Sequence, residues 1–171
     1  MATRVSLHPF LAGMDRKHLA LLTDCAIGSH FKKGQVILKE GEQANRFYLI
    51  ESGKVILESG RAYDRPVIID TIGAGDLLGW SWMFSPYTWQ FTARATVPTS
   101  AIFFYGTILR EYCERDHSLG YELLKRMTAI MMRRMQAARQ KMIDLHVGDT
   151  SLEPIPVQSP CTDQELDKPL L

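Results

Sequence analysis

A chain of 171 residues can build one sizeable hydrophobic core and fits one domain with appendages. Its 20 basic and 19 acidic residues leave a net charge of +1, which excludes a strong field for nucleic acid or an anionic membrane. The three cysteines are widely spaced, which argues against a disulfide framework or a zinc site and indicates a reducing, cytoplasmic environment. The first ten residues lack the apolar core of a secretory signal, and no apolar run approaches the roughly 18 residues of a membrane span.

The first predicted elements are one short helix and a long β region. Leucines and alanines recur at helical spacing over residues 15–26, where Asp15 can cap the start of a helix. From residue 30 to residue 105, short runs of β-branched and aromatic residues are interrupted by glycines every eight to twelve residues or so, which is typical of an all-β barrel or sandwich. Within this region, Ser52 and Gly53 predict a tight turn between two strands, because glycine readily adopts the positive φ of such turns.

Two further helices are predicted over residues 107–116 and 118–146. The longer one carries nearly four heptads, which we call the heptad seam: its a positions are Tyr121, Thr128, Met135 and Met142, and its d positions are Leu124, Met131, Ala138 and Leu145. A second apolar stripe of Leu123, Met127 and Ile130 lies beside the seam. One stripe can therefore pack on the β domain while the seam meets a partner helix, which predicts a homodimer; the alternative is that both stripes bury against the same domain.

The last part of the chain has a different composition. From residue 148 onward it carries four prolines and five acidic residues but only one lysine, which cannot bury enough apolar surface to order itself. The predicted organisation is therefore a single domain over residues 1–147 that includes the helix 118–146, followed by a flexible tail over residues 148–171.

The most informative stretch runs from residue 73 to residue 95. It contains a glycine-marked turn, an aromatic-rich loop and a return strand, which is the layout of a pocket for a phosphorylated small molecule. Six aromatic residues fall within twelve positions of this loop, and they can stack on a planar ligand or fill the pocket themselves. They are Trp80, Trp82, Phe84, Tyr87, Trp89 and Phe91.

Four segments in this order and spacing resemble the cyclic-nucleotide-binding domains of the catabolite activator protein and of the regulatory subunits of cyclic-AMP-dependent kinase. They are Phe-Lys-Lys-Gly-Gln-Val-Ile-Leu-Lys-Glu-Gly at 31–41, Phe-Tyr-Leu-Ile-Glu-Ser-Gly-Lys-Val at 47–55, Gly-Asp-Leu-Leu-Gly at 75–79 and Thr-Ala-Arg-Ala at 92–95. The resemblance covers residues 10–147. It implies a mainly β fold with flanking helices: an eight-stranded jelly-roll β-barrel, a short N-terminal helix and a long C-terminal dimerisation helix that transmits the ligand signal.

The resemblance also locates a ligand pocket whose polar anchors are missing. The family places a carboxylate for the ribose 2′-hydroxyl where this chain has Trp80, and a guanidinium for the cyclic phosphate where it has Trp89, followed by Gln90. A phosphate without a charge-assisted partner loses roughly 1.5–3 kcal/mol, so cyclic AMP is not expected to bind in the usual way. The predicted pocket residues are Gly79, Trp80, Ser81, Trp89, Gln90, Phe91, Thr92 and Arg94.

Several readings of this pocket stay open. The aromatic residues can plug it and leave a protein-interaction scaffold, or they can hold an apolar or planar effector. Backbone amides near Gly79, Trp80 and Ser81 can still bind a cyclic nucleotide if a helix starts there. Strand alternation places Arg94 opposite to Ala93 and Ala95, which predicts an outward, solvated side chain.

The remaining functional classes have little support in the sequence. The histidines show no arrangement with a nucleophile and no metal-ligand spacing, so we expect no enzyme, no metal and no cofactor. The residues after the long helix are too few and too proline-rich for a helix-turn-helix unit, so no direct DNA binding is expected. Redox sensing through Cys25 or Cys113 has no basis beyond their presence. The sequence thus favours a non-enzymatic regulatory module that senses a small-molecule effector, without a membrane or DNA partner.

Overall fold

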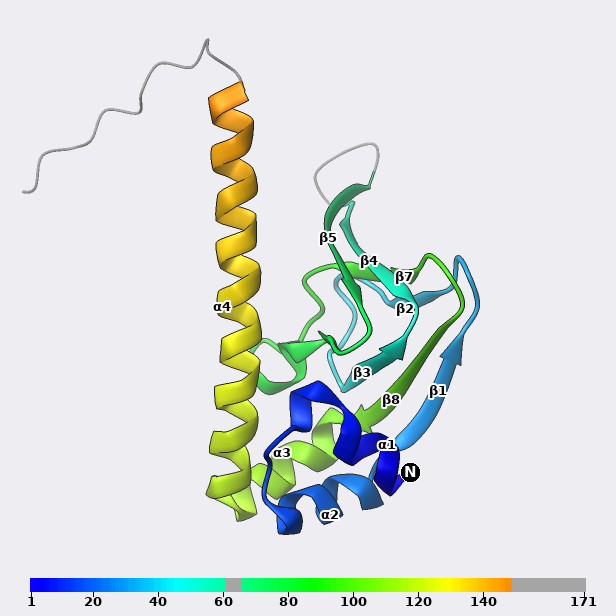
Figure 1. Cartoon of the computed structure of the whole chain (residues 1–171), viewed down its shortest axis with the longest axis vertical. Coiled ribbons are helices and arrows are strands. Elements are labelled where there is room, and N and C mark those ends of the chain that lie inside the picture. Colours follow the sequence, from blue (N-terminus) through cyan, green and yellow to red (C-terminus); the bar gives the residue numbers. More distant parts are fainter. Residues whose placement is uncertain (61–65, 149–171) are drawn as a thin grey trace, which may run out of the picture. The chain divides into compact units, whose positions relative to one another are not determined.

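The computed structural model describes residues 1–60 and 66–148. The chain divides into two compact units, Met1–Met132 and Arg133–Leu171. The first unit contains every strand of the described residues together with the start of the long helix, and Figure 1 shows helices α1, α2 and α3 gathered on one side of the strands. No helix in these described ranges is both long and apolar enough to cross a membrane.

Eight strands form two antiparallel four-stranded sheets, in the orders β1-β8-β3-β6 and β2-β7-β4-β5. This is the strand order of a double-sheet jelly roll, which confirms the predicted topology. All strand ladders of the described residues lie within one sheet or the other, so the predicted closed barrel is corrected to two facing sheets. The strands are β1 (Ile27–Phe31), β2 (Val36–Leu38), β3 (Arg46–Ser52), β4 (Lys54–Ser59), β5 (Val67–Gly73), β6 (Leu77–Leu78), β7 (Thr92–Ala95) and β8 (Thr99–Tyr105).

The turn predicted at Ser52 and Gly53 exists, but it does not close a hairpin. Strands β3 and β4 lie on either side of it and belong to different sheets, so the turn carries the chain from one sheet to the other. Gly53 has a φ of +101°, and a Cβ at this position would lie 2.4 Å from the Thr99 hydroxyl oxygen and 2.8 Å from the Pro98 carbonyl oxygen. Glycine is therefore required by both the backbone conformation and the close approach of the β7–β8 connection.

The helices agree with the sequence in most places. Helix α2 covers Arg16–Asp24, and its predicted cap is present, since the Asp15 carboxylate accepts a hydrogen bond of 2.7 Å from the Lys17 N–H. Helix α3 covers Gly106–Arg115 and helix α4 covers His117–Gly148, close to the predicted ranges. Helix α1 (Ala2–Leu7) was not predicted; it has no side-chain cap and is followed by the 3₁₀ turn η1 (Pro9–Leu11).

The interior of the first unit consists of two hydrophobic clusters on opposite faces of the β1-β8-β3-β6 sheet. Along β3, the side chains of Phe47 and Leu49 enter one cluster and those of Tyr48 and Ile50 enter the other, as strand alternation requires. The roll cluster lies between the two sheets and comprises Ile37, Leu38, Ala44, Tyr48, Ile50, Val55, Leu57, Ile72, Leu78, Trp89, Phe91, Ala93, Ala95 and Ala101. The helix-side cluster comprises Val5, Phe10, Leu11, Met14, Leu22, Phe47, Leu49, Leu77, Trp82, Ile102, Phe104, Leu109, Leu119, Leu123, Met127 and Ile130.

The start of α4 packs into the helix-side cluster through the stripe that the sequence indicated. Leu123, Met127 and Ile130 are all buried there, which confirms that this stripe faces the domain. Arg126, on the same part of the helix, donates hydrogen bonds to the carbonyl oxygens of Phe10 (3.1 Å) and Ala12 (2.8 Å). These bonds tie α4 to the η1 turn, so Arg126 has a structural partner inside the unit.

Asp116 joins α2 to the beginning of α4. Its carboxylate accepts hydrogen bonds from the Ser118 and Leu119 amides and from the Lys17 ammonium, the last at 2.7 Å. The Lys17 hydrogen bond, with the Leu119 amide, lowers the pKa of the Asp116 carboxyl to about 2. The side chain therefore stays ionised as the N-cap of α4 at any ordinary pH.

His8 fixes the N-terminal segment to strand β3. Its Nδ1 accepts a hydrogen bond of 3.2 Å from the Phe10 N–H, so the ring is the tautomer with a protonated Nε2, which donates to the Ile50 carbonyl oxygen at 3.0 Å. The ring is buried, and burial lowers the pKa of His8 below its ordinary value. Protonation of Nδ1 would remove the acceptor for Phe10, so the neutral form is the one that fits the fold.

The second unit contains the described end of α4, up to Gly148. In this part the heptad seam positions Met135, Ala138, Met142 and Leu145 are all exposed. The predicted tail over residues 148–171 lies, apart from Gly148, outside the described residues.

Substitution of Gly53 by alanine tests the crowding at the sheet crossover. We expect Gly53→Ala to lower the free energy of unfolding by roughly 2–4 kcal/mol, because it adds a steric clash to the cost of a left-handed backbone. Gly34 provides the matched control: its φ is +84°, but a Cβ there would meet no atom within 4 Å, so Gly34→Ala should cost only about 1 kcal/mol. Urea denaturation measures both values, and equal losses would contradict the crowding argument.

The pH dependence of stability tests the state of His8. Because the folded pKa lies below the unfolded value of about 6.5, His8 contributes stability that is fully present above that pH and is lost as pH falls below it. The urea midpoint of the wild-type protein should therefore decrease between pH 7 and pH 5 more steeply than that of a His8→Gln variant. Identical slopes in the two proteins would show that His8 does not titrate with unfolding.

Candidate functional site

The aromatic loop of residues 79–91 leaves the edge strand β6 and returns to β7. Gly79, with a φ of +89°, turns the chain into the 3₁₀ turn η2 (Trp80–Met83). Backbone hydrogen bonds then hold the loop to residues 41–44: the Ala44 N–H donates to the Tyr87 carbonyl (2.7 Å), and Gly41 and Glu42 exchange bonds with Trp89 (both 2.9 Å). The loop is thus fixed by a second segment of the chain as well as by its own turns, in which the Tyr87 N–H donates to the Phe84 carbonyl at 2.9 Å.

The indole of Trp89 lies inside the jelly roll, against the backbone of Gly79. Trp89 is only 3% exposed and belongs to the roll cluster. A Cβ on Gly79 would lie 3.0 Å from Cζ3 and 3.1 Å from Cη2 of Trp89, and 3.2 Å from Cδ1 of Leu38. The indole therefore occupies the space directly over this glycine, and the glycine is needed for the close approach as well as for the positive φ.

Trp80 and Phe91 lie next to each other at the side of the roll cluster. Their ring centroids are 6.1 Å apart with an interplanar angle of 81°, an edge-to-face contact. Phe91 is buried, whereas Trp80 is half-buried and packs against both the roll cluster and the helix-side cluster. Trp89 and Phe91 thus lie in the roll cluster, Trp80 packs against it, and Gly79 lies beneath the Trp89 indole.

The other aromatic residues of the loop point elsewhere. Trp82 is fully buried in the helix-side cluster, where it stacks on Phe47 at a centroid distance of 5.5 Å. Phe84 and Tyr87 are partly exposed, and the Arg110 guanidinium lies 4.3 Å from the centre of the Tyr87 ring, a cation–π contact between the loop and α3. The six aromatic residues therefore do not form one cluster, because the loop distributes them over two cores and the surface.

The predicted pocket residues with polar side chains have surroundings of their own: Ser81 is buried in η2. Gln90 is exposed, and its amide donates to the Thr88 carbonyl oxygen at 3.1 Å. The Thr92 hydroxyl accepts a hydrogen bond from the Glu40 N–H at 3.1 Å. Thr92 and Arg94 alternate with Ala93 and Ala95, which belong to the roll cluster, so both point away from the interior of the roll.

Arg94 is held on that outer face by an ion pair. Its Nε and Nη2 both donate to Oε1 of Glu58, at 3.0 and 2.8 Å, and its Nη1 donates to the Gly34 carbonyl oxygen at 3.1 Å. The outward direction agrees with strand alternation, and the guanidinium is in addition paired with Glu58, a buried partner that the sequence did not indicate. Arg94 lines a cavity of about 380 Å³ on this face together with Val36, Lys39, Glu40, Glu58 and Thr92.

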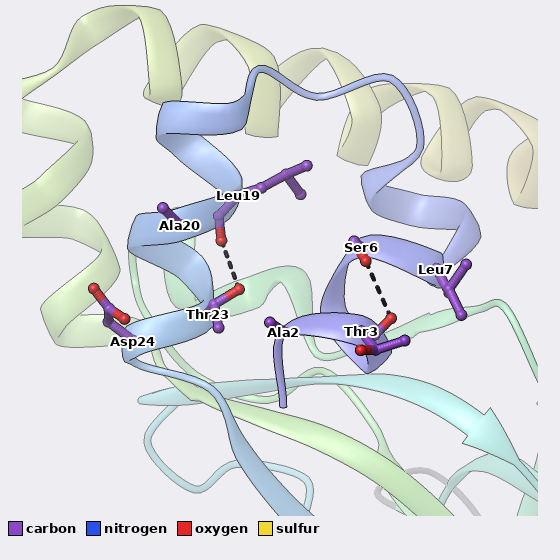
Figure 2. Close-up of a pocket in the computed structure, with 8 residues that line it drawn as sticks. All are labelled: Ala2, Thr3, Ser6, Leu7, Leu19, Ala20, Thr23 and Asp24. Carbon is purple, nitrogen blue, oxygen red and sulfur yellow. Dashed lines mark hydrogen bonds between the residues drawn. The ribbon is translucent and has the colours of Figure 1, made fainter.

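A second hollow lies between α1 and α2, where sequence reasoning indicated no site. It has a volume of about 500 Å³ and is lined mainly by small and apolar side chains, among them Ala2, Leu7, Leu19 and Ala20 (Figure 2). Two of its hydroxyl groups bond within their own helices, since Thr23 donates to the Leu19 carbonyl (2.7 Å) and Ser6 to the Thr3 carbonyl (3.2 Å). No sequence motif accompanies this hollow, because it arises from the packing of the two helices.

The reactive groups of the described residues give no indication of catalysis. Burial raises the pKa of the Cys113 thiol to about 11 and also raises the pKa of Cys25, so both thiols stay protonated at neutral pH. No three His, Cys, Asp or Glu side chains within residues 1–60 and 66–148 are placed to hold a metal ion. The structure thus adds nothing in favour of redox sensing through either cysteine.

The fold agrees with comparisons to known proteins. The family model described as the cyclic nucleotide-binding domain matches residues 29–116, and the chain belongs to this family. A solved structure from Geobacter metallireducens GS-15, assigned as a cyclic nucleotide-binding protein, is 28% identical, covers 78% of this chain and 95% of its own, and superposes with a TM-score of 0.67.

Two curated relatives carry the same domain within longer proteins. Human cGMP-dependent protein kinase 2 is 30% identical over 70 residues, which are 40% of this chain and 9% of the kinase. The CRP-like cAMP-activated global transcriptional regulator of Mycobacterium tuberculosis is 24% identical over 137 residues, which are 80% of this chain and 59% of the regulator. The chain therefore spans only part of the length of these relatives.

Proposed function

We propose that this protein is a non-enzymatic, cytoplasmic regulatory module of the cyclic nucleotide-binding fold, dimeric through the heptad seam of α4 and without direct DNA binding. Its pocket has diverged: aromatic side chains occupy the position of the ligand anchors, so cyclic AMP does not bind through the usual ion pair. The observation that carries the proposal is the buried indole of Trp89 over Gly79, at the position where the family resemblance places the phosphate-binding guanidinium.

The chemistry of the roll interior supports a filled pocket. The members of the roll cluster are hydrophobic residues, whose polar side-chain groups are the Tyr48 hydroxyl and the Trp89 indole N–H, and burial raises the pKa of the Tyr48 phenol. Arg94 is engaged with Glu58 on the outer face. A cyclic phosphate placed over Gly79 would have to displace the Trp89 indole and would meet no cation from the roll cluster, and an unpaired buried charge costs several kcal/mol or more.

Binding through backbone amides alone is the weaker alternative. The short helix that it requires is present as η2, but η2 has only four residues, and the indole of Trp89 already covers the glycine at its start. An effector that does act on the protein is better matched by a planar or apolar molecule that replaces an aromatic ring. Such a molecule would exchange stacking contacts rather than an ion pair.

The exposure of the heptad seam supports the homodimer. In the first unit, Tyr121 and Leu124 are 65% and 40% exposed, although the neighbouring stripe on the same helix is buried. In the second unit, Met135, Met142 and Leu145 are 58%, 62% and 74% exposed. A row of apolar side chains at heptad spacing with this exposure is matched by a second copy of the same helix, where each a and d side chain becomes buried.

Calorimetric titration with cyclic AMP and cyclic GMP tests the pocket. The wild-type protein should bind either nucleotide with a Kd weaker than about 1 mM, which corresponds to less than about 4 kcal/mol. A Trp80→Glu/Trp89→Arg double variant restores both anchors. Each charge-assisted hydrogen bond contributes about 1.5–3 kcal/mol, so the double variant should bind cyclic nucleotide at least about tenfold more tightly than the wild-type protein. The single variant Trp80→Glu is the control and should stay weak; micromolar binding by the wild-type protein would overturn the proposal.

Sedimentation equilibrium tests the dimer. Met135→Glu places a charge on the seam in both subunits. Each subunit then loses about 1.5 kcal/mol of the free energy gained by burying the Met135 side chain, which should weaken association roughly 100-fold. Gln136→Glu adds the same charge one residue away, at an exposed position outside the seam, and should leave the mass unchanged. A wild-type monomer at micromolar concentration, or equal effects of the two substitutions, would contradict a dimer built on this seam.

A further inference from the structure

The outer face of the β2-β7-β4-β5 sheet carries the polar cavity that Arg94 lines. This cavity, which we call the outer cavity, has a volume of about 380 Å³, within the range of roughly 300–1,000 Å³ that is usual for small-molecule sites. Val55 and Leu57 of β4 belong to the roll cluster, so Glu58, the next residue, points to the other face of the sheet. The outer cavity is therefore separate from the roll interior.

The hydrogen-bond donors of Arg94 are already used. Its Nε and Nη2 both donate to Oε1 of Glu58, and its Nη1 donates to the Gly34 carbonyl oxygen, so each of its three nitrogen atoms has a partner. Lys39, the other cation among the described lining residues, has a side chain that is 69% exposed and lies 3.9 Å from a carboxylate oxygen of Glu42. An anionic ligand would therefore compete with Glu58 for Arg94.

Two carboxylates of the outer cavity keep the capacity to accept hydrogen bonds. Glu58 is only 8% exposed, and within residues 1–60 and 66–148 its Oε2 receives no hydrogen bond, because Arg94 donates to Oε1 alone. The Glu40 carboxylate accepts bonds from two neutral donors, the Ser59 hydroxyl and the Gly60 N–H. No cation of the described part of the chain lies within ion-pair distance of Glu40, so its charge is uncompensated there.

Thr92 brings the two carboxylates together. It is the cross-strand partner of Glu58 on β7, and the Cβ atoms of such a pair are about 4.5–5.5 Å apart. The Thr92 hydroxyl also accepts a hydrogen bond of 3.1 Å from the Glu40 N–H. Ser59, which follows Glu58 in the chain, bonds the Glu40 carboxylate directly. Glu40 and Glu58 therefore line the same small volume.

We propose that the outer cavity binds a small molecule that carries a guanidinium group, with this group between the Glu40 carboxylate and Oε2 of Glu58. A guanidinium has five N–H donors in one plane and no acceptor, which matches two carboxylates with free lone pairs. It also compensates the charge of Glu40. Val36, which lines the cavity and is 41% exposed, provides an apolar contact for the rest of the molecule. The proposal is independent of the proposed function, because it involves neither the roll interior nor the heptad seam.

Butylguanidinium and butylurea are a matched pair of probes, because their heads have the same planar shape and differ in charge. In titrations of the full chain followed by ¹H–¹⁵N NMR, butylguanidinium should bind with a Kd on the order of 1 mM, as its small size allows. The Gly60 and Glu40 amides should shift, because they bond the Glu40 carboxylate and the Thr92 hydroxyl, whereas the Leu119 amide in the α4 cap should not. Butylurea should bind at least about tenfold more weakly. Equal binding of the two probes would overturn the proposal.

Substitution of Glu40 tests the anchor. Glu40→Gln removes the charge but keeps an oxygen for the Ser59 and Gly60 donors, so it should weaken butylguanidinium binding about tenfold and leave the urea midpoint nearly unchanged. Glu42→Gln is the matched control, because it makes the same charge change at a side chain that is 63% exposed, and it should change the Kd less than about twofold. Equal effects of the two substitutions would indicate attraction by the general surface charge and overturn the proposal. If circular dichroism shows that Glu40→Gln does not fold, the comparison of the two probes on the wild-type protein decides.

Two further probes test the charge and the source of the ligand. Pentanoate has a similar apolar chain with an anionic head and should leave the Gly60 and Glu40 amides in place at concentrations that saturate the site with butylguanidinium. Binding of pentanoate there would make Arg94 or Lys39 the anchor and overturn the proposal. The tripeptide acetyl-Gly-Arg-Gly-amide presents the same guanidinium from a peptide and should bind more weakly than butylguanidinium, because its backbone must also fit at a cavity of about 380 Å³. Tighter binding of the tripeptide would assign the cavity to an arginine of a partner protein and contradict a small-molecule site.

Discussion

The structure depends on one sheet that is buried on both faces. The β1-β8-β3-β6 sheet separates the roll cluster from the helix-side cluster, and β3 and β8 contribute alternate side chains to each. This arrangement explains why Phe47 through Ile50 form an unbroken apolar run, and why helices must cover the outer face.

The proposed pocket and the heptad seam differ in how much of their apolar surface is buried. Inside the roll, Trp89 is buried over Gly79 and Phe91 meets Trp80, so the apolar surface there is already covered. Along α4, Met135, Met142 and Leu145 remain exposed in the single chain. Apolar burial is thus complete around Gly79 and incomplete along the heptad seam, and the proposed homodimer and the proposed loss of the nucleotide site both rest on this contrast.

Local rules predicted the elements whose stability is local. Asp15 caps α2 because its carboxylate bonds an amide two residues away, and the stripe of Leu123, Met127 and Ile130 is visible in the sequence because helical spacing is a local property. Helix α1 was not predictable in this way. It has no side-chain cap, and its stability comes from the buried Val5 and from the ion pair of Arg4 with Glu51, a residue 47 positions away.

The sequence by itself determined the fold family and the change from a β region to the helices α3 and α4, and through the family resemblance it predicts indoles at positions where the family has charged anchors. Only the tertiary structure decided that the Ser52–Gly53 turn joins two sheets, that Trp82 leaves the pocket for the other core, and that Arg94 pairs with Glu58. The reason is that the local sequence is compatible with several long-range arrangements in each case. A glycine turn can join strands of one sheet or of two, an aromatic ring can pack into either core, and an outward arginine can pair with more than one partner. The choice between them depends on contacts with residues distant in the chain, such as Thr99 at Gly53 and Phe47 at Trp82.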